Sequence, residues 1–387
     1  MEFNTVIVRY GEMSTKGKNK KDFINRLAAS ISKALIKYED KYQMVKRHDH
    51  IYLYLKEEIK DIRKILEEVP GMYSFSLAYL LEDCELDNLL NKTLELIKEE
   101  NGSTFKVKTH RIDKSYPYTS DDINRKVADN ILKNTSLKVD IHNPEILLGI
   151  EIRDDGAYIF TETIKGLGGY PQGAIGRSLM MLSGGIDSPV ASYLLMKRGI
   201  ELNFIHYASP PYTSTQVIEK LKDLLTELLP YQSKINLYII PFTKIQEEIY
   251  NHSFEGYPVT IMRRMMYRIA EKLANKLHIY SISNGESIGQ VASQTLESLY
   301  VINKVTSLPV IRPLATYDKI DIIEIAKKIN TYDISIRPFE DCCTIFPVKN
   351  PKTHPKEEDC LKIESKFDYE SLIDECVNNA KKEVIKL

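Results

Sequence analysis

The second half of the chain alternates short apolar segments, typical of buried strands, with longer segments whose apolar residues recur at helical spacing. The strand-like segments include SLMML, ELNFIHY, INLYIIPF and IYSISN, and helix-like segments such as PVASYLLMKRG lie between them. Strands and helices that alternate in this way form a parallel sheet with helices on both faces. We therefore predict an α/β fold for this half of the chain.

The first of these strands runs into the loop Ser-Gly-Gly-Ile-Asp-Ser, which is followed by a helix. Such a loop lies at the carboxyl edge of a parallel sheet, where the helix offers free backbone N–H groups to an anion. Gly184 and Gly185 let the backbone approach a phosphate closely. Ser183 and Ser188 add hydroxyl donors. Asp187 needs a cation between its carboxylate and a bound triphosphate, and we infer Mg²⁺.

Two other interpretations of this loop are weaker. A Walker-type phosphate loop is excluded, because no G-x-x-x-x-G-K-[ST] occurs in the sequence. The loop could also be a tight turn that only caps a helix. The strand before it, the helix after it and the aspartate within it favour the anion site.

Composition limits the class of protein. The chain has 387 residues, of which 43% are hydrophobic, enough for two or three ordinary domains. It contains no run of roughly 18 apolar residues and begins without a secretory signal pattern. Its 5 cysteines are odd in number and scattered along the chain, unlike those of a disulfide framework. We expect a cytoplasmic protein with reduced thiols and no membrane partner.

Patterns along the chain predict three domains and a linker. Residues 1–58 read as a small α+β domain, and residues 59–165 as a second one. The glycine-rich residues 166–176 form the expected linker, and residues 177–387 form the parallel-sheet domain. Asp154-Asp155-Gly156 predicts a hairpin turn, and the charged tail from Lys356 onward is expected to be helical.

The loop SGGIDS resembles the PP-loop of ATP pyrophosphatases, which cleave ATP between the α and β phosphates and adenylate a substrate. The resemblance continues in GGYPQG, HYASPPYTS, IMRRMMYRIAE, SNGESIGQVASQTLESL, VIRPLATYDKIDIIEIAKKI and EDCCTIF. The segments TSDDINRKVADNILKN and VDIHNPEILLGIEIRDDGAYIFTE resemble a THUMP domain, an RNA-binding module. Over almost its whole length the chain is similar to the ThiI-type tRNA sulfurtransferases, the tRNA 4-thiouridine synthetases.

This resemblance implies a fold and a nucleotide site. The fold is α/β, with ferredoxin-like and THUMP domains before a PP-loop domain of the adenine nucleotide alpha hydrolase type. The implied ATP contacts are Met181, Leu182, Ser183, Gly184, Gly185, Ser188, His206, Tyr207, Arg263, Gly285 and Gln294.

Some of these residues also have ordinary structural interpretations. His206 could be a histidine at a strand end with its hydrogen bonds satisfied, and Gln294 could cap a helix. Gly285 could be an ordinary turn glycine, or it could mark a point where the backbone passes close to a ring. Arg263 and Arg264 are adjacent on a helix and therefore face about 100° apart. We expect one to point to the nucleotide and the other to meet solvent.

The resemblance also implies a reaction. A uracil carbonyl is a poor leaving group, so exchange of oxygen for sulfur requires activation of that oxygen. In this family AMP is attached to O4 of uridine 8 in tRNA, pyrophosphate leaves, and a persulfide sulfur displaces AMP at C4. Asp187 would position Mg²⁺ or the substrate. The implied partners are tRNA and a cysteine desulfurase or other persulfide donor; a homodimer and a second role in thiamine thiazole synthesis are left open.

Two adjacent thiols are the candidates for sulfur transfer. Cys343 matches the catalytic-domain cysteine of the family, and Cys342 is the second choice. Both could instead be buried small hydrophobes. A metal site with His354 and Cys360 lacks a C-x-x-C pair, and we predict none. Longer relatives carry a rhodanese domain, which we do not expect here, so the route of sulfur delivery is open.

Evidence for RNA binding is local. The net charge of −1 gives no overall attraction to nucleic acid. Basic residues in the segments that resemble RNA-binding domains are candidates for phosphate contacts, although lysine runs are often only solvated faces. These candidates are Lys16, Lys18, Lys20, Lys108, Arg111 and Lys114.

Two other functions are left open. One is a different PP-loop adenylating synthetase, such as an amide synthetase; it would need an ammonia source, and no glutaminase module is recognisable. The other is a non-catalytic tRNA-binding module that has kept a nucleotide fold.

Overall fold

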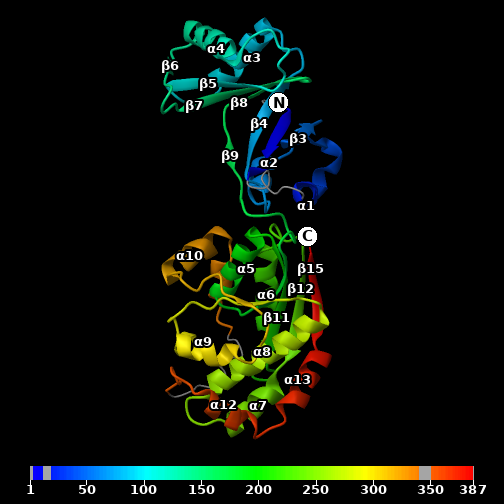
Figure 1. Cartoon of the computed structure of the whole chain (residues 1–387), viewed down its shortest axis with the longest axis vertical. Coiled ribbons are helices and arrows are strands. Elements are labelled where there is room, and N and C mark those ends of the chain that lie inside the picture. Colours follow the sequence, from blue (N-terminus) through cyan, green and yellow to red (C-terminus); the bar gives the residue numbers. More distant parts are fainter. Residues whose placement is uncertain (1–2, 12–18, 340–349, 387) are drawn as a thin grey trace. The chain divides into compact units, whose positions relative to one another are not determined.

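The computed structural model describes residues 3–11, 19–339 and 350–386. The chain forms two compact units, Met1–Pro171 and Gln172–Leu387 (Figure 1). Across these described ranges, no helix has both the length and the apolar character needed to cross a membrane.

The first unit is built on one sheet. Its strands are β1 (Thr5–Arg9), β2 (Tyr42–Lys46), β3 (His50–Leu55), β4 (Ser74–Leu81), β5 (Thr104–Arg111), β6 (Lys138–Val139), β7 (Ile146–Arg153), β8 (Gly156–Phe160) and β9 (Ile164–Lys165). They pair in the order β2-β3-β1-β4-β8-β7-β5-β6, and β9 pairs with β4. The helices are α1 (Lys20–Ala34), η3 (Ile36–Lys41), α2 (Ile62–Glu67), α3 (Leu86–Lys98) and α4 (Ser120–Asn134).

Strand β4 takes part in two pairings. Its first part pairs antiparallel with β1, from Ser74 to Ala78, and its last part pairs antiparallel with β8, from Tyr79 to Leu81. The sheet is therefore continuous through β4, and the domain boundary between residues 58 and 59 stays a prediction.

The predicted hairpin is confirmed. Arg153 pairs with Gly156 at the end of β7 and β8, which leaves Asp154 and Asp155 as a two-residue turn. Helix α4 begins with a capping box, in which the Thr119 hydroxyl accepts from the Asp122 N–H and the Asp122 carboxylate accepts from the Thr119 N–H.

The second unit contains the predicted parallel sheet. Its strands are β10 (Gly176–Met181), β11 (Ile200–Ala208), β12 (Lys234–Pro241), β13 (Ile282–Ser283), β14 (Val310–Ile311) and β15 (Lys381–Lys386). They pair in the order β14-β13-β10-β11-β12-β15. The pairings from β14 to β12 are parallel, as predicted, and β15 is antiparallel.

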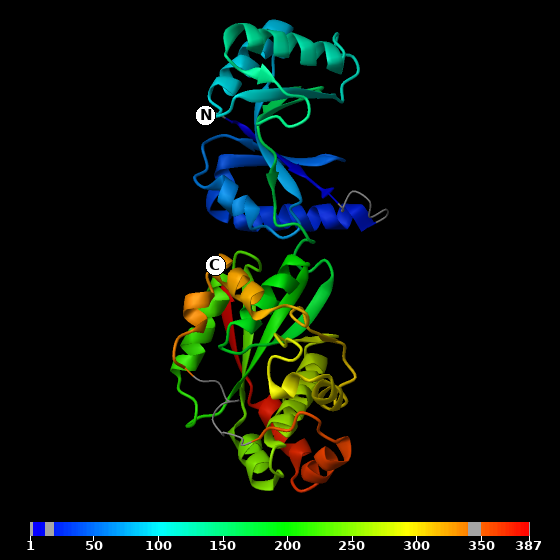
Figure 2. The same cartoon turned by 90° about the vertical axis from the view of Figure 1, so that its left-hand side faces the viewer.

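Helices lie on both sides of this sheet (Figure 2). They are α5 (Asp187–Lys197), α6 (Gln216–Glu227), α7 (Thr243–His252), α8 (Pro258–Lys276), η4 (Ala292–Gln294), α9 (Leu296–Asn303), α10 (Lys319–Lys328), α11 (Tyr332–Ser335), α12 (Glu357–Glu364) and α13 (Tyr369–Asn378). Buried Ile261 and Met265 of α8 share one apolar core with Leu179 of β10 and Ile205 of β11. This core fixes α8 across the central strands.

The charged tail is only partly helical. Helices α12 and α13 agree with the prediction, but the prediction is wrong for Lys381–Lys386, which form β15. The backbone groups along the outer edge of β12 need partners, and this short alternating segment supplies them.

Candidate active site

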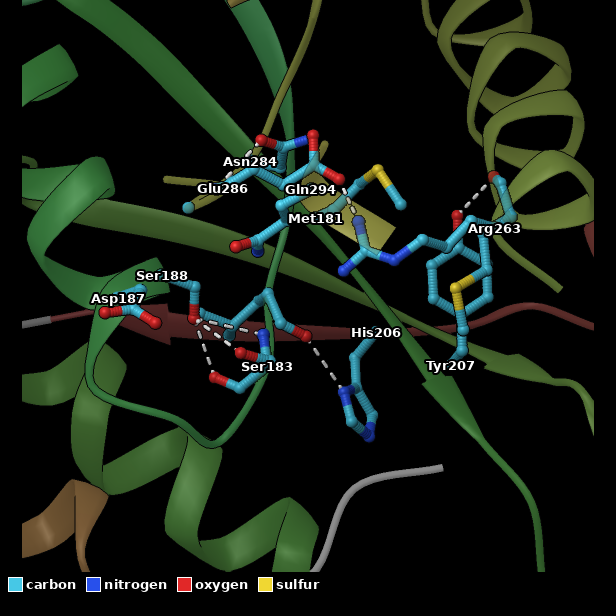
Figure 3. Close-up of a pocket in the computed structure, with 13 residues that line it drawn as sticks. Met181, Ser183, Asp187, Ser188, His206, Tyr207, Arg263, Asn284, Glu286 and Gln294 are labelled. Carbon is cyan, nitrogen blue, oxygen red and sulfur yellow. Dashed lines mark hydrogen bonds and ion pairs between the residues drawn. The ribbon is translucent and has the colours of Figure 1, made fainter. Parts of the chain in front are cut away.

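A cavity of about 200 Å³ opens at the carboxyl end of β10. In the sheet, β10 lies between β11 and β13. The chain leaves β10 towards β11 on one side and later returns to β13 on the other, so this is the topological switch point, where open α/β sheets bind ligands. The cavity is lined by Met181, Leu182, Ser183, Asp187, Ser188, His206, Tyr207, Arg263, Met266, Asn284, Gly285, Glu286 and Gln294 (Figure 3).

Most of the residues predicted to contact ATP meet in this cavity. Asp187 lines it as well. Gly184 and Gly185 belong to the same loop but are not among the lining residues. The structure therefore brings the sequence candidates together in space, and their roles as ATP contacts stay predictions.

The loop is closed by its two serines. The Ser188 hydroxyl donates to the Ser183 carbonyl oxygen at 2.8 Å and accepts from the Ser183 N–H at 3.1 Å. Helix α5 begins at Asp187, so Ser188 contributes to this bridge from the first turn of the helix. The bridge holds the loop against the first turn of the helix, where backbone N–H groups have no intrahelical partner.

Gly285 packs against the backbone of this loop. A Cβ placed on Gly285 would lie 2.8 Å from both the Asp187 carbonyl carbon and the Ser188 nitrogen. The sequence analysis expected the backbone at this glycine to pass close to a ring. In the structure, the nearest atoms belong to the backbone at the start of α5. Only a residue without a Cβ fits at this distance.

Both oxygens of the Asp187 carboxylate have partners in the chain. Lys319 Nζ, at the start of α10, lies 2.5 Å from Oδ1, and Gln290 Nε2 donates to Oδ2 at 3.2 Å. Sequence analysis did not single out either partner. Within the described ranges, no group of three or more His, Cys, Asp and Glu side chains is placed to hold a metal ion.

Two residues of β11 connect the loop and α8 to the sheet. His206 is buried, and its Nδ1 lies 3.1 Å from the Leu182 carbonyl oxygen. The Tyr207 hydroxyl donates to the Met266 carbonyl oxygen at 2.6 Å. These contacts fix both walls of the cavity to one strand.

The wall of the cavity also carries a charge network around Glu286. Its side chain is 4% exposed and forms ion pairs with Arg263 and with Arg312, whose Nε donates at 2.7 Å. Asn284 Nδ2 donates to the same carboxylate at 2.8 Å, and the Tyr267 hydroxyl donates at 3.2 Å. Burial raises the pKa of Tyr267, which keeps its hydroxyl protonated and able to donate.

The expectation that the arginine next to Arg263 meets solvent is wrong. Arg264 is buried, and its Nε and Nη2 donate to Glu364 at 2.6 and 3.0 Å. Burial alone would raise the pKa of the Glu364 carboxyl, but hydrogen bonds from Arg264 and Arg268 outweigh it and lower the pKa below its usual value. The partner carboxylate, supplied by α12, is what permits this buried arginine.

Sequence reasoning missed three lining residues. Asn284 and Glu286 flank Gly285 directly after β13, and the rule that parallel strands end at the ligand edge could have found them. Met266 lies on the same helix as Arg263, one turn further along, and no signal separates it from the other apolar residues of α8.

The other predicted residues belong to the first unit or lie outside the described residues. Cys342, Cys343, Lys16 and Lys18 are outside the described residues. Lys20 begins α1, and its Nζ lies 3.5 Å from His48 Nε2.

The remaining basic candidates lie on or just after β5. Lys108 is exposed on this strand. Arg111 Nη1 donates to the carbonyl oxygens of Tyr116 and Tyr118, and Lys114 Nζ donates to the Arg111 carbonyl oxygen at 2.8 Å. Arg111 thus has a structural role in shaping the connection to α4.

Family models match three consecutive parts of the chain. Residues 173–369 match "Thiamine biosynthesis protein (ThiI)", residues 5–76 match the ThiI ferredoxin-like domain, and residues 85–162 match the THUMP domain.

Similar proteins cover nearly the whole chain. A probable tRNA sulfurtransferase of Lactobacillus gasseri is 45% identical over 98% of this chain and 95% of its own length. One from Geobacillus kaustophilus is 44% identical over 100% of this chain and 96% of its own length. The crystal structure of a 4-thiouridine synthetase–RNA complex with bound ATP matches with a TM-score of 0.91, at 36% identity, over 99% of this chain and 100% of that one. A structure from Pyrococcus horikoshii matches with a TM-score of 0.66 at 26% identity, over 84% of this chain and 99% of that one.

Proposed function

Because the chain belongs to the ThiI family of tRNA sulfurtransferases, we propose that its cavity binds ATP and that the enzyme uses this ATP to convert uridine 8 of tRNA into 4-thiouridine. The observation that carries the proposal is the meeting of the loop SGGIDS with His206, Arg263 and Gln294 in one cavity at the switch point of a parallel sheet. Charge, backbone donors and an amide converge there.

The cavity offers one set of groups suited to the phosphates of ATP and one suited to its adenine. The glycine-serine loop and the first turn of α5 present backbone donors of the kind that bind phosphates. Gln294 is buried, and its Oε1 has no hydrogen-bond partner within the described part of the chain. A buried amide oxygen without a donor is costly, and the exocyclic amino group of adenine would satisfy it.

Asp187 is the residue that fits Mg²⁺. This ion is commonly held by one or two carboxylates together with substrate phosphates, and Asp187 is the carboxylate at the loop. Lys319 and Gln290 hold the carboxylate in place. Bound Mg²⁺ would supply charge neutralisation for the pyrophosphate that departs when O4 of the uracil is adenylated.

The chain's own residues then have defined tasks. Loop N–H groups and the Ser183 hydroxyl hold the phosphates, while the Ser188 hydroxyl, which donates to the Ser183 carbonyl oxygen, keeps the loop closed. The Arg263 guanidinium offers further donors to phosphate oxygens. Donors that are fixed before the reaction stabilise developing charge without reorganisation. His206 supports the loop through its contact with the Leu182 carbonyl oxygen.

For the sulfur step we propose Cys343 as the thiol that receives persulfide sulfur, with Cys342 as the alternative. The donor is a cysteine desulfurase or another persulfide carrier. Thiolation assays of Cys343→Ser and Cys342→Ser with a desulfurase test this choice. Loss of activity only in Cys342→Ser would mean that the other thiol acts.

For the RNA partner we propose that tRNA lies on the first unit, with phosphate contacts from Lys16, Lys18, Lys20, Lys108, Arg111 and Lys114. A role in thiamine thiazole synthesis and a homodimeric state remain predictions from the resemblance, and a cytoplasmic location remains a prediction from composition.

The decisive experiment compares Asp187→Ala with Asp321→Ala, a control that removes an exposed carboxylate from the first turn of α10. We expect Asp187→Ala to lower the rate of tRNA thiolation by about 100-fold or more, and the control to keep it. Mass spectrometry of tRNA nucleosides measures 4-thiouridine. Undiminished thiolation in Asp187→Ala would mean that the loop is not catalytic. AMP transfer to a small acid without tRNA would indicate a different synthetase.

A further inference from the structure

The carboxylate of Glu286 pairs with the Arg263 guanidinium at the wall of the cavity, and both residues line it (Figure 3). Arg263 comes from α8, whereas Glu286 comes from the segment after β13. The side chain of Arg263 is 21% exposed and lines the cavity, and that of Glu286 is 4% exposed. The pair therefore joins a helix to the sheet edge directly beside the proposed ATP.

The other partners of Glu286 hold it still. Arg312 donates to it and also donates to Asn303 Oδ1 at 3.1 Å and to the Tyr267 hydroxyl at 3.2 Å. Asn284 Nδ2 donates to both the Tyr267 hydroxyl and the Glu286 carboxylate. Several groups other than Arg263 thus fix Glu286, and both Glu286 and Arg263 line the cavity.

The charges in this network favour an anionic ligand. One carboxylate faces two guanidinium groups, so the network keeps a net positive charge after the ion pairs form. Of the two guanidinium groups, only that of Arg263 belongs to a lining residue. A phosphate in the cavity would meet that group already oriented by the carboxylate.

We infer that Glu286 is a positioning residue, which holds the Arg263 guanidinium at the cavity wall in the orientation that binds a phosphate group of ATP. An arginine side chain has many rotamers, and a fixed carboxylate selects one before the nucleotide arrives. The inference rests on the proposed function, because it names what orients one of its ATP contacts.

The chain contains a matched control on the same helix. Arg264 follows Arg263 directly and also pairs with a buried carboxylate, Glu364, but neither of these two residues lines the cavity. Both carboxylates are shared with a second arginine, which is Arg312 for Glu286 and Arg268 for Glu364. Loss of either carboxylate removes a similar buried ion pair, and only one loss changes the cavity wall.

The first experiment compares Glu286→Gln with Glu364→Gln. Glutamine keeps the size of the side chain and removes the charge. Both variants are expected to lower the thermal midpoint. Glu286→Gln should raise the KM for ATP in tRNA thiolation by roughly 10-fold or more, with a smaller change in kcat, whereas Glu364→Gln should keep KM within about twofold of the parent. Equal changes in KM for both variants would reduce Glu286 to a structural role and overturn the inference.

The second experiment asks whether Glu286 acts through Arg263. Arg263→Ala should itself raise KM, and adding Glu286→Gln to it should change KM by less than about twofold. Effects that multiply would overturn the inference. Should Glu286→Gln fail to fold, Glu286→Asp takes its place, because its shorter side chain keeps the charge and moves it away from Arg263. If Arg263→Ala binds ATP as the parent does, the proposed ATP site itself fails, a result distinct from failure of the positioning role.

Discussion

Gly285→Ala tests how the loop SGGIDS is held in place. The added methyl group would lie 2.8 Å from two backbone atoms of Asp187 and Ser188, and ordinary van der Waals contact begins at 3.4 Å. The loop or the segment after β13 would therefore have to move by roughly 0.6 Å. Gly285 is not among the glycines with positive φ, so the backbone itself tolerates alanine and the effect is one of space.

Overpacking of this kind costs about 1–3 kcal/mol. For a unit the size of Gln172–Leu387, each kcal/mol lowers the thermal midpoint by about 2–4 °C. The displaced atoms belong to the first turn of α5, so ATP affinity should fall together with stability. Differential scanning calorimetry and equilibrium titration with ATP measure the two effects.

Gly185→Ala is the control for this prediction. A Cβ at Gly185 would have only the Ser183 hydroxyl nearby, at 3.6 Å, which is ordinary contact. We expect its thermal midpoint to match that of the parent. If Gly285→Ala also melts and binds ATP like the parent, the loop does not rest on Gly285 and the steric reasoning is refuted.

Three further predictions follow from the same geometry. Lys319→Met removes the charged partner of Asp187 and should slow pyrophosphate release in single-turnover assays by about 10-fold or more. An unchanged rate would show that the contact between Lys319 and Asp187 does not contribute to this step. Gln294→Ala should weaken ATP binding by about 10-fold and leave weak GTP binding unchanged, as measured by competition titration, because its amide oxygen is proposed to accept from adenine. The pKa of Glu364 is lowered in the folded chain from a usual value of 4.5, so its contribution to stability is complete above about pH 4.5 and is lost as the pH falls through the folded value. The difference in thermal midpoint between the parent and Glu364→Gln should therefore shrink on acidification below about pH 4.5, and a difference independent of pH would contradict the assignment.

The parallel sheet and its ligand edge could be predicted because the signals are local. Strand and helix periodicities are read within short windows, and the carboxyl-edge rule then places the loop after β10 beside His206 at the end of β11. The turn at Asp154 and Asp155 is equally local.

Contacts between distant segments were beyond that reasoning. Arg264 is buried because Glu364, 100 positions away, neutralises it. Asp187 and Lys319 are separated by 132 positions. The conversion of the tail into β15 depends on the open edge of β12, which periodicity in the tail does not reveal. Each of these features depends on the assembled fold, which brings distant segments together.

The antiparallel direction of β15 has a practical consequence for handling the protein. Lys386 pairs with Lys234, at the first residue of β12, whereas the cavity lies where β10 ends, at Met181. The last described residues therefore lie at the rim of the sheet remote from the cavity. A fluorophore or a sensor surface coupled beside Lys386 would leave the mouth of the cavity free, which makes this end the natural attachment point for real-time binding measurements.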